Sequence, residues 1–504
     1  MSKHDFLVVV PVADRPRHIQ ACLTSLRNAL QRFPYAGRIR VLIADDSADV
    51  ASIATNRAIA RQFSADGLEV IHFPPEEQIA LVRSLGIVLP RVLGDAPPDH
   101  FGHKGQGVMR NIAYLKVAEM LRLQPDNKTL IWSIDSDQEF RVNVTEDDGY
   151  VVDFFNGLDA IFARSDAQVL TGKVVGDPPV SPAVMTRNFL DDVLAFLAQM
   201  AERDPATACG HHDAEAASGD AAYHDMADLF GFKPADSYAY PCPLIDAHGG
   251  THTEADCFAN FAGRVNSFFY GEHPTRISGY VAGELFASVQ PARTVYAGNY
   301  VFRPEVLRYF IPFATLRLRM SGPTLGRIVK AELGPRFVSA NLPMLHKRTV
   351  ESGGQSEFRP GIDTQHATID MSGEFERQFY GDVMLFSVEK LTAAGNLCRL
   401  VSADFSQTLD ETRGEMLARY NARQQAILER LEKLEGLLDN PTYWWHGHAA
   451  GFRQFATNVR RNFGTASSGH ARINDAANWT LWRGRLLDAL THYAEDRAAW
   501  SQLI

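Results

Sequence analysis

Cysteine is scarce in this chain, with five residues among 504. They are Cys22, Cys209, Cys242, Cys257 and Cys398. An odd and sparse set argues against a disulfide framework and indicates a reduced, cytoplasmic protein. Long apolar runs are also missing, since no stretch reaches the roughly 18 residues that a membrane-spanning helix needs. The apolar run at residues 6–12 is followed at once by "ADRPR", which is typical of a strand and not of a signal peptide.

An excess of positive charge is absent too. Asp and Glu number 60 against 50 Lys and Arg, which gives a net charge of -10. No basic field exists to draw the chain to nucleic acid, so we expect no nucleic-acid partner. The hydrophobic content of 45% is ordinary for a globular protein, and the length predicts two or three domains.

The first 140 residues alternate between two kinds of pattern. Continuous apolar runs predict strands buried on both faces, at residues 6–12, 38–47, 68–74 and 129–135. Runs with helical spacing lie between them, at residues 16–33, 51–65 and 107–121. This alternation predicts a parallel sheet in an α/β domain, in which ligands bind at the carboxyl ends of the strands.

The stretch "LIWSIDSDQEF" places two carboxylates, Asp135 and Asp137, one residue apart at the tip of a buried strand. Mg²⁺ and Mn²⁺ take carboxylate oxygens and leave coordination positions for phosphate oxygens. One acid can bind such an ion directly, and the other directly or through water. A solvated turn would show the same short pattern, but the buried strand before it favours the metal site.

The stretch "HKGQGVMRNIAYL" places Gly105 and Gly107 at the start of a predicted helix. Glycine allows the backbone to approach a ligand closely, and a helix N-terminus favours anions. Lys104 adds a positive charge that suits a diphosphate. A glycine-containing loop with a solvated lysine is the simpler interpretation of this stretch taken alone.

The stretch "LIADDSAD" places Asp45 and Asp46 at the end of the second predicted strand. Such acids can accept hydrogen bonds from a nucleobase, and we assign that role to Asp46. A turn that caps the following helix is the alternative interpretation.

Taken together, these motifs resemble the GT-A glycosyltransferases, which use nucleotide-sugar donors. "VVVPVADRP" and "IADDS" resemble the opening strand and base-binding acids of the family 2 enzymes. "HKGQGVMRNIA" is similar to the "GKG" loop of glucosyl-3-phosphoglycerate and mannosylglycerate synthases, and "DSD" to the family's metal motif. The resemblance covers about the first 140 residues and resumes more weakly at 298–307 and 342–348. It implies catalytic roles for Asp137, Arg110 and Lys104. It also implies a donor site formed by Pro11, Asp14, Asp45, Asp46, Lys104, Gly105, Arg110, Asp135, Ser136 and Arg348.

His346 lies in "NLPMLHKR", where several GT-A enzymes carry a histidine that completes the metal site. The resemblance therefore implies a site for Mg²⁺ or Mn²⁺ made of Asp135, Asp137 and His346. Imidazole is an acceptable ligand for Mn²⁺ beside two carboxylates. Lys347 and Arg348 would neutralise the leaving diphosphate. The alternative is a surface histidine in a basic turn.

An acid is missing where inverting GT-A enzymes usually carry their general base. The corresponding stretch, "RLRMSGPTLGRIV" at 317–329, has a plausible helix start without Asp or Glu. Because a leaving phosphate can take the acceptor proton in retaining enzymes, this absence favours retention. An inverting base could come from Asp246, Glu254 or Glu284, so inversion stays open.

Residues 196–285 have weak periodicity and are rich in Gly, Ala, His and Asp, which predicts an insertion or acceptor-side lobe. The residues there that could ligate zinc are Cys209, His211, His212, Cys242, His248, His252 and Cys257. Their spacing is irregular and matches no finger motif, so a loop with scattered histidines is the favoured interpretation. From about residue 387 the pattern is helical, and a long amphipathic helix near 408–438 is typical of a bundle or an oligomer interface. The tryptophans beyond it are expected to be core anchors.

We therefore expect an α/β GT-A domain over 1–385, with the 196–285 insertion, and an α-helical C-terminal domain over 386–504. The activity expected is transfer of a sugar from a UDP- or GDP-sugar to a carbohydrate or small-molecule acceptor, with Gly298, Asn299 and Arg303 lining the acceptor or sugar pocket. A sugar-phosphate nucleotidyltransferase is the first alternative, but it would need a glycine-rich loop directly after the first strand. A non-catalytic scaffold is the second alternative, and it would predict a broken metal site.

Overall fold

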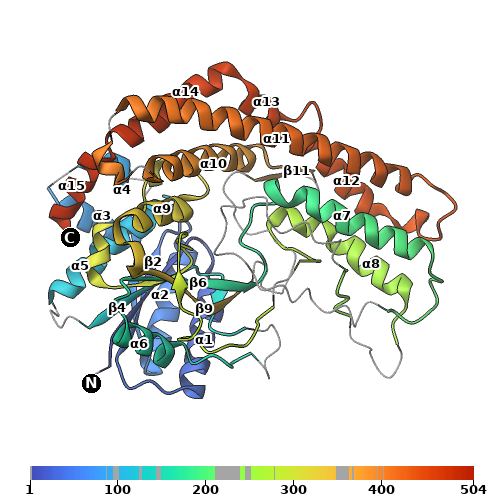
Figure 1. Ribbon diagram of the computed structural model, residues 1–504. Coiled ribbons are helices and arrows are strands. Elements are labelled where there is room, and N and C mark those ends of the chain that lie inside the picture. The colour runs from blue at the N-terminus through green and yellow to red at the C-terminus, as the bar shows by residue number, and fades with distance from the viewer. Residues whose placement is uncertain are drawn as a thin grey trace.

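The computed structural model describes residues 3–86, 88–94, 102–123, 128–142, 149–210, 239–244, 251–276, 279–347, 362–365, 368–393, 395–400 and 402–504. A sheet forms the centre of the N-terminal region (Figure 1). Its strand order is β3-β2-β1-β4-β8-β6-β9-β5, with β7 also paired to β9. The strands are β1 (Asp5–Val12), β2 (Ile39–Asp45), β3 (Glu69–Phe73), β4 (Thr129–Ile134), β5 (Gln138–Glu139), β6 (Val169–Gly176), β7 (Gln290–Pro291), β8 (Asn299–Phe302) and β9 (Phe337–His346).

The sheet is parallel across β3, β2, β1 and β4, as the alternating pattern predicts. Beyond β4 it is mixed, because β8 runs antiparallel to both β4 and β6. Alternate residues of β1 enter two different cores: Leu7 and Val9 face one, and Phe6 and Val8 face the other. Both faces are therefore covered, which explains why β1 reads as one continuous apolar run.

The helices of the N-terminal region include all three that the sequence predicts. These are α1 (Pro16–Arg32), α2 (Val50–Ala65) and α5 (Gln106–Leu123). The structure adds α3 (Pro75–Ser84), α4 (Pro90–Leu93), α6 (Phe154–Arg164) and α9 (Ser321–Leu333). Helix α5 is buried on several sides and begins at the "KGQG" loop, so its N-terminus is held at the same edge as the carboxyl end of β4.

A lobe beside the sheet is formed by α7 (Pro182–Ala201) and α8 (Glu254–Arg264), with the C-terminal helix α12 (Ala450–Phe463) against them (Figure 1). Helix α8 begins with a capping box between Thr253 and Asp256, which satisfies two of the free N–H groups of its first turn. The expected insertion at 196–285 thus contains regular structure that its weak periodicity did not predict.

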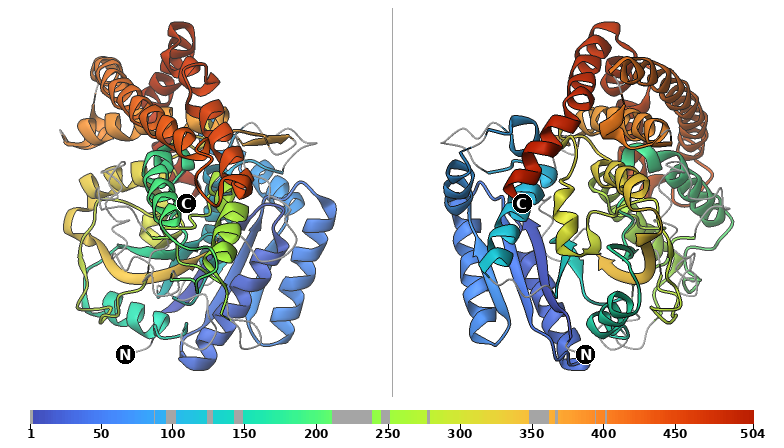
Figure 2. Two further views of the ribbon diagram at one scale, coloured as in Figure 1. Left: turned by 90° about the vertical axis from the view of Figure 1, so that its right-hand side faces the viewer. Right: turned by 60° about the vertical axis from the view of Figure 1, so that its left-hand side comes forward.

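The C-terminal region is helical, as expected. It contains α10 (Ser372–Ala393), α11 (Ser402–Leu438), α12, α13 (Ser468–Asn474), α14 (Ala476–Thr491) and α15 (Tyr493–Leu503), and a short hairpin of β10 (Asp363–Gln365) and β11 (Thr368–Asp370) precedes it. Both views of Figure 2 show the helices of this region, coloured orange to red, mostly on the opposite side of the molecule from the N-terminus. The apolar side of α11 packs on helices of its own chain, so an oligomer through these helices stays a prediction.

The C-terminal helix α15 packs against the sheet region. Trp500 is fully buried and donates from Nε1 to the carbonyl oxygen of Leu307 at 2.7 Å. Arg91 pairs with both carboxylate oxygens of Asp496, at 2.9 and 3.0 Å. The sheet region and the helical region therefore share one continuous core. Helices α7 and α10 continue through residues 196 and 385, so the division into domains at those residues stays a prediction.

The fold class is confirmed as an α/β region with a mixed sheet followed by a helical C-terminal region. Within the described residues, every helix is too short or too polar to cross a bilayer.

Candidate active site

The carboxyl ends of three parallel strands bring the acidic motifs to one edge of the sheet. Strand β1 pairs in parallel with β2 on one side and with β4 on the other. Strand β9 reaches the same edge, where His346 pairs in register with Gln138 of β5. The residues after β1, β2 and β4 therefore meet the end of β9, a strand about 200 residues further along the chain. We call this region the sheet edge.

Asp137 and His346 lie together at the centre of the sheet edge. Nε2 of His346 is 3.5 Å from Oδ2 of Asp137, and both side chains are buried. Nδ1 of His346 lies 2.6 Å from the backbone oxygen of Asp177, which can only accept a hydrogen bond. Nδ1 therefore donates to that oxygen, and in the neutral imidazole Nε2 turns its lone pair toward Asp137, as in histidines that ligate metals.

Asp135 lies in a second, adjoining part of the sheet edge. It forms an ion pair with Arg110 of α5, and its Oδ1 accepts a hydrogen bond from Gln106 at 3.3 Å. Gly298, which precedes β8, covers the other carboxylate oxygen so closely that a Cβ at this position would collide with it. Any side chain at residue 298 would therefore displace Asp135.

The two acids and the imidazole expected to bind the metal, Asp135, Asp137 and His346, do not form one compact set. Within the described part of the chain, their ligand atoms do not all lie within 4.8 Å of one another, whereas those of Cys209, Cys242 and Cys257 do. The pair of Asp137 with His346 fits a divalent ion, because one carboxylate and one neutral imidazole are suitable ligands at this spacing. Asp135 is positioned by Arg110 instead.

Asp46 connects the end of β2 to the loop of Lys104 and Gly105, which we call the "KG" loop. Its carboxylate accepts hydrogen bonds from the backbone N–H groups of Lys104 and Gly105, at 3.0 and 3.1 Å, and pairs with Nζ of Lys104 at 2.6 Å. Burial raises the pKa of Asp46 and lowers the pKa of Lys104, while the ion pair acts in the opposite direction on each. The loop turns at Gly105, whose φ of 95° lies in the left-handed region that favours glycine.

Asp45 is fully buried beside Asp46 and is held by three donors. It accepts from Asn56 and from the backbone N–H of Ser47, at 3.0 Å each, and lies 2.8 Å from Nε2 of His72. Burial alone would raise the pKa of Asp45, but the hydrogen bonds from His72, Ser47 and Asn56 outweigh it and lower the pKa. Asp45 therefore shapes the end of β2.

Asp14 joins the loops that follow β1 and β2. Its carboxylate accepts from the backbone N–H of Asp49 at 3.0 Å and pairs with His103, and its own N–H donates to Ser47 at 2.8 Å. Its φ of 53° is left-handed, a conformation that costs energy for any residue other than glycine. Two further expected residues also lie at this edge: Pro11 pairs with Ala44 near the end of β1, and Ser136 is buried between the two acids.

Two of the residues expected to line a sugar or acceptor pocket have other positions. Asn299 is fully buried and bonds the carbonyl oxygens of Lys173 and Leu342, at 2.9 and 2.8 Å. The expectation for Arg303 is wrong, because β8 is antiparallel and carries Arg303 to the opposite edge, where it bonds the carbonyl oxygens of Phe162 and Ala167. Arg348 lies outside the described residues.

Two arginines at the sheet edge were not predicted from the sequence. Arg15, just after Asp14, has a guanidinium nitrogen 3.6 Å from Oδ2 of Asp137. Arg317 is exposed, and its Cγ lies near Gly105, 3.8 Å from where a Cβ would be. Phe313, Arg317 and Met320 all have left-handed φ values, between 52° and 68°. Three strained residues so close to the "KG" loop indicate a functional segment. Backbone strain cannot be predicted from the sequence, so this segment could be recognised only in the structure.

Glu254, one of the acids considered as a general base, lies in the lobe and not at the sheet edge. Glu254 is buried at the start of α8, where it forms an ion pair with Arg203. Glu284 is exposed, and Asp246 lies outside the described residues.

No protein-family model and no curated protein sequence matches the chain. Several solved enzymes are similar at low identity. PcManGT, a mannosyltransferase from Pyrobaculum calidifontis in complex with GDP-Man and Mn²⁺, is 10% identical with a TM-score of 0.35, and the match covers 98% of this chain and 87% of that one. Mannosyl-3-phosphoglycerate synthase from Rubrobacter xylanophilus is 14% identical with a TM-score of 0.22, over 38% of this chain and 47% of that one. Mouse xyloside xylosyltransferase 1 is 10% identical with a TM-score of 0.24, over 67% and 79%.

Proposed function

We propose that this chain is a glycosyltransferase that moves a sugar from a nucleoside-diphosphate sugar to a carbohydrate or small-molecule acceptor. The observation that carries the proposal is the pair of Asp137 and His346, whose facing atoms lie 3.5 Å apart at the carboxyl end of the sheet. Strand ends at this position in open α/β sheets are where ligands bind. The hydrogen bond from His346 to Asp177 fixes the imidazole in the form that can accept a cation.

Asp137 and His346 would hold Mg²⁺ or Mn²⁺, with Asp135 linked to the ion through water. A divalent ion there would act as a Lewis acid and offset the charge that develops on the leaving diphosphate. Arg110, buried in α5, keeps the Asp135 carboxylate turned toward the sheet edge. Arg15 supplies a second positive charge, near the same oxygen of Asp137 that faces His346.

The donor would lie along the loops that follow β1 and β2 and against the N-terminus of α5. Free backbone N–H groups at the start of a helix favour phosphate. Lys104 and Gly105 are held at that point by Asp46, so the acid positions the diphosphate-binding loop. We assign nucleobase contacts to the same acidic segment, Asp45 to Ser47, with UDP- and GDP-sugars as the candidate donors.

We propose that transfer proceeds with retention of configuration. Among the described residues, Glu254 is paired with Arg203 in the lobe, and the start of α9 carries no acid. The acceptor proton would then pass to the departing diphosphate, which Lys104 and Arg317 would help to stabilise. Inversion would instead require a carboxylate within hydrogen-bond reach of the acceptor hydroxyl.

The test is a panel of UDP- and GDP-sugars incubated with the full chain, with and without Mn²⁺. We expect metal-dependent hydrolysis of at least one donor, detected by mass spectrometry, and a freed sugar whose first-formed anomer matches the donor in NMR spectra. An opposite first-formed anomer would overturn retention but leave the transferase activity standing. Absence of both turnover and binding for every donor would overturn the proposed function, and formation of a nucleotide-sugar from a nucleoside triphosphate and a sugar phosphate would favour a nucleotidyltransferase instead.

A further inference from the structure

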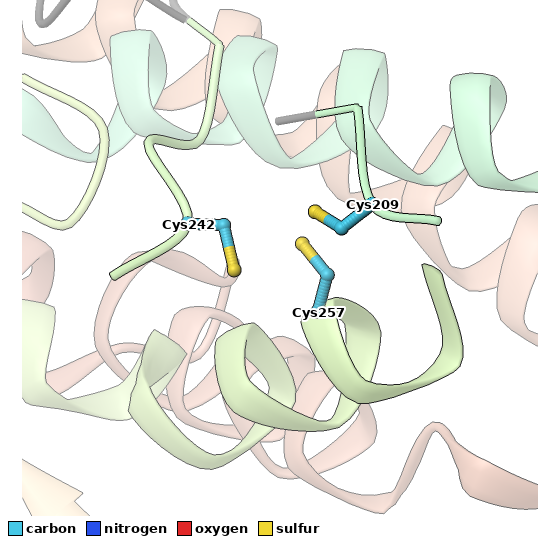
Figure 3. A group of neighbouring side chains, drawn as sticks. All are labelled: Cys209, Cys242 and Cys257. Atoms are coloured by element: carbon cyan, nitrogen blue, oxygen red, sulfur yellow. The ribbon is translucent and has the colours of Figure 1, made fainter. Parts of the chain in front are cut away.

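Three cysteines that are far apart in the sequence meet in the lobe formed by α7 and α8. Their sulfur atoms all lie within 4.8 Å of one another. Figure 3 shows the sulfurs of Cys209, Cys242 and Cys257 turned toward one shared space, from two loop segments and from α8. Cys242 and Cys257 are buried, and Cys209 is half-buried.

A histidine stands next to this cluster. Nε2 of His252 lies 3.3 Å from Sγ of Cys242. Tetrahedral zinc with Zn–S bonds of about 2.3 Å and Zn–N bonds of about 2.0–2.1 Å places ligand atoms about 3.5–3.8 Å apart. The 3.3 Å between His252 and Cys242 is close to this spacing, and the three sulfurs are near enough to share one ion. His252 is not within 4.8 Å of all three sulfurs, so its ring would turn toward the centre of the cluster on binding. His211, His212 and His248 lie outside the described residues.

We infer that Cys209, Cys242, His252 and Cys257 form a structural zinc site. The ligand set is the three-cysteine, one-histidine type that zinc favours where all four positions are filled by protein. Thiolates also select zinc over the hard ions Mg²⁺ and Mn²⁺. Because zinc takes thiolates, binding would release the three thiol protons to solvent, and the neutral imidazole would bind through Nε2.

The backbone around the cluster is already arranged to hold the ligands. Ala208 forms an antiparallel bridge with Thr253, and the N–H of Cys209 donates to the carbonyl oxygen of His252 at 3.0 Å. Cys257 lies in the first turn of α8, directly after the capping box that starts at Thr253. Three of the four ligands are thus fixed relative to one another by main-chain hydrogen bonds.

The fourth ligand, Cys242, comes from a short segment that aromatic packing holds in place. Tyr240 stacks on Phe261 of α8 with ring centroids 4.2 Å apart, and it also packs on Phe196 of α7. The metal would join residues 205–210, residues 239–244 and α8 at one point. This arrangement indicates a stabilising role for the lobe, separate from the sheet edge and independent of the proposed reaction.

The test is the zinc content of the untagged full chain, measured by elemental mass spectrometry after dialysis against zinc-free buffer. We expect about one zinc per chain, and a large loss in each of C209S, C242S, H252A and C257S. Cys398→Ser is the matched control for Cys209→Ser, because both residues are half-buried, and it should keep its zinc. Asp137→Ala should also keep it, since that residue lies at the sheet edge.

Cobalt binding provides a second measurement of the site. It does not depend on how much zinc a variant keeps during purification. Co²⁺ added to the chelated chain should produce the intense thiolate charge-transfer absorption of tetrahedral cobalt, and C209S should weaken it. Two results would overturn the inference. One is a wild-type chain that binds zinc no better than C209S. The other is a chain that, after denaturation in chelator without reductant, has three reactive thiols instead of all five, because that result would mean a disulfide within the cluster.

Discussion

Buried ionisable groups at the sheet edge and in the helical half of this molecule have different surroundings. At the sheet edge, Asp137 faces an imidazole and a guanidinium at 3.5 and 3.6 Å, distances longer than those of a tight hydrogen bond. In the helical half, Asp382 is fully buried and accepts short hydrogen bonds of 2.6 Å from Gln378 and Tyr420. The first arrangement suits binding, and the second suits folding.

The same contrast holds for arginines. Arg276, in the lobe, is fixed by both carboxylate oxygens of Asp192 at 2.8 Å, and Thr275 donates to the same acid. Arg317, at the sheet edge, is exposed and lies beside the "KG" loop. Substitutions at the sheet edge should therefore change activity with little effect on stability, and substitutions among the buried groups of the lobe and the helical half should change stability with little effect on activity.

The largest effect is expected for Asp137→Ala. If Asp137 holds the divalent ion, its loss removes several kcal/mol of transition-state stabilisation, which lowers kcat/KM by roughly 10²- to 10⁴-fold. Mn²⁺-dependent donor affinity, measured by calorimetry, should fall as well, while Tm stays near that of the wild type. Asp382→Asn is the control and should retain donor affinity. Unchanged metal-dependent donor binding in Asp137→Ala would contradict the assignment.

The second effect is a dependence of stability on pH that comes from Asp382. Burial raises the pKa of Asp382 to about 7, and the hydrogen bonds from Tyr420 and Gln378 offset only part of this. The folded chain therefore holds a proton that the unfolded chain, with an Asp pKa of about 4, releases. The contribution is fully present below about pH 4 and is lost as the pH rises through about 7, by roughly 4 kcal/mol in total.

Asp382→Asn mimics the protonated acid at every pH. Its free energy of unfolding should therefore rise relative to the wild type between about pH 4 and pH 7, as measured by urea unfolding across that range. A difference that stays constant with pH would show that Asp382 does not titrate in this window. Donor binding should be the same in both proteins, which separates this effect from the sheet edge.

The third effect is expected for Gly298→Ala. The added Cβ would collide with the carboxylate of Asp135 and displace it from Arg110. A displacement of about 1 Å at a reacting centre can lower the rate by about 10²-fold. Gly414→Ala in α11 is the matched control, because a Cβ there meets no atom within 4 Å. That variant should keep full activity, and an equal activity in Gly298→Ala would mean that Asp135 does not need its observed position.

The sequence predicts those parts of the fold and of the site that depend on the pattern of neighbouring residues along the chain. Asp135 and Asp137 could be placed because they follow a buried strand, and parallel strands deliver their ends to one edge. Arg303 could not be placed, since the antiparallel direction of β8 is set by pairing and not by local pattern. Helix α7 was missed because it is buried on several sides, which removes the amphipathic signal. The cysteines were named as possible zinc ligands, but the sequence could not bring them together, because they are separated by intervals that encode no motif.

The smallest effect on activity is expected for substitutions of Arg317. Three of them separate the contribution of its charge from that of its strained backbone. Its φ of 52° costs energy for arginine and lysine but not for glycine. If the charge near Gly105 assists the diphosphate, Arg317→Lys should keep most activity, and Arg317→Ala and Arg317→Gly should each lose about 10-fold in kcat/KM, or about 1.4 kcal/mol. The loss should shrink as salt is added, because an exposed charge is screened. Wild-type activity in Arg317→Gly would show that the strained segment 313–320 positions the loop without a role for this charge. Arg317 would then be a residue that serves folding, like Arg276, and not one that serves binding.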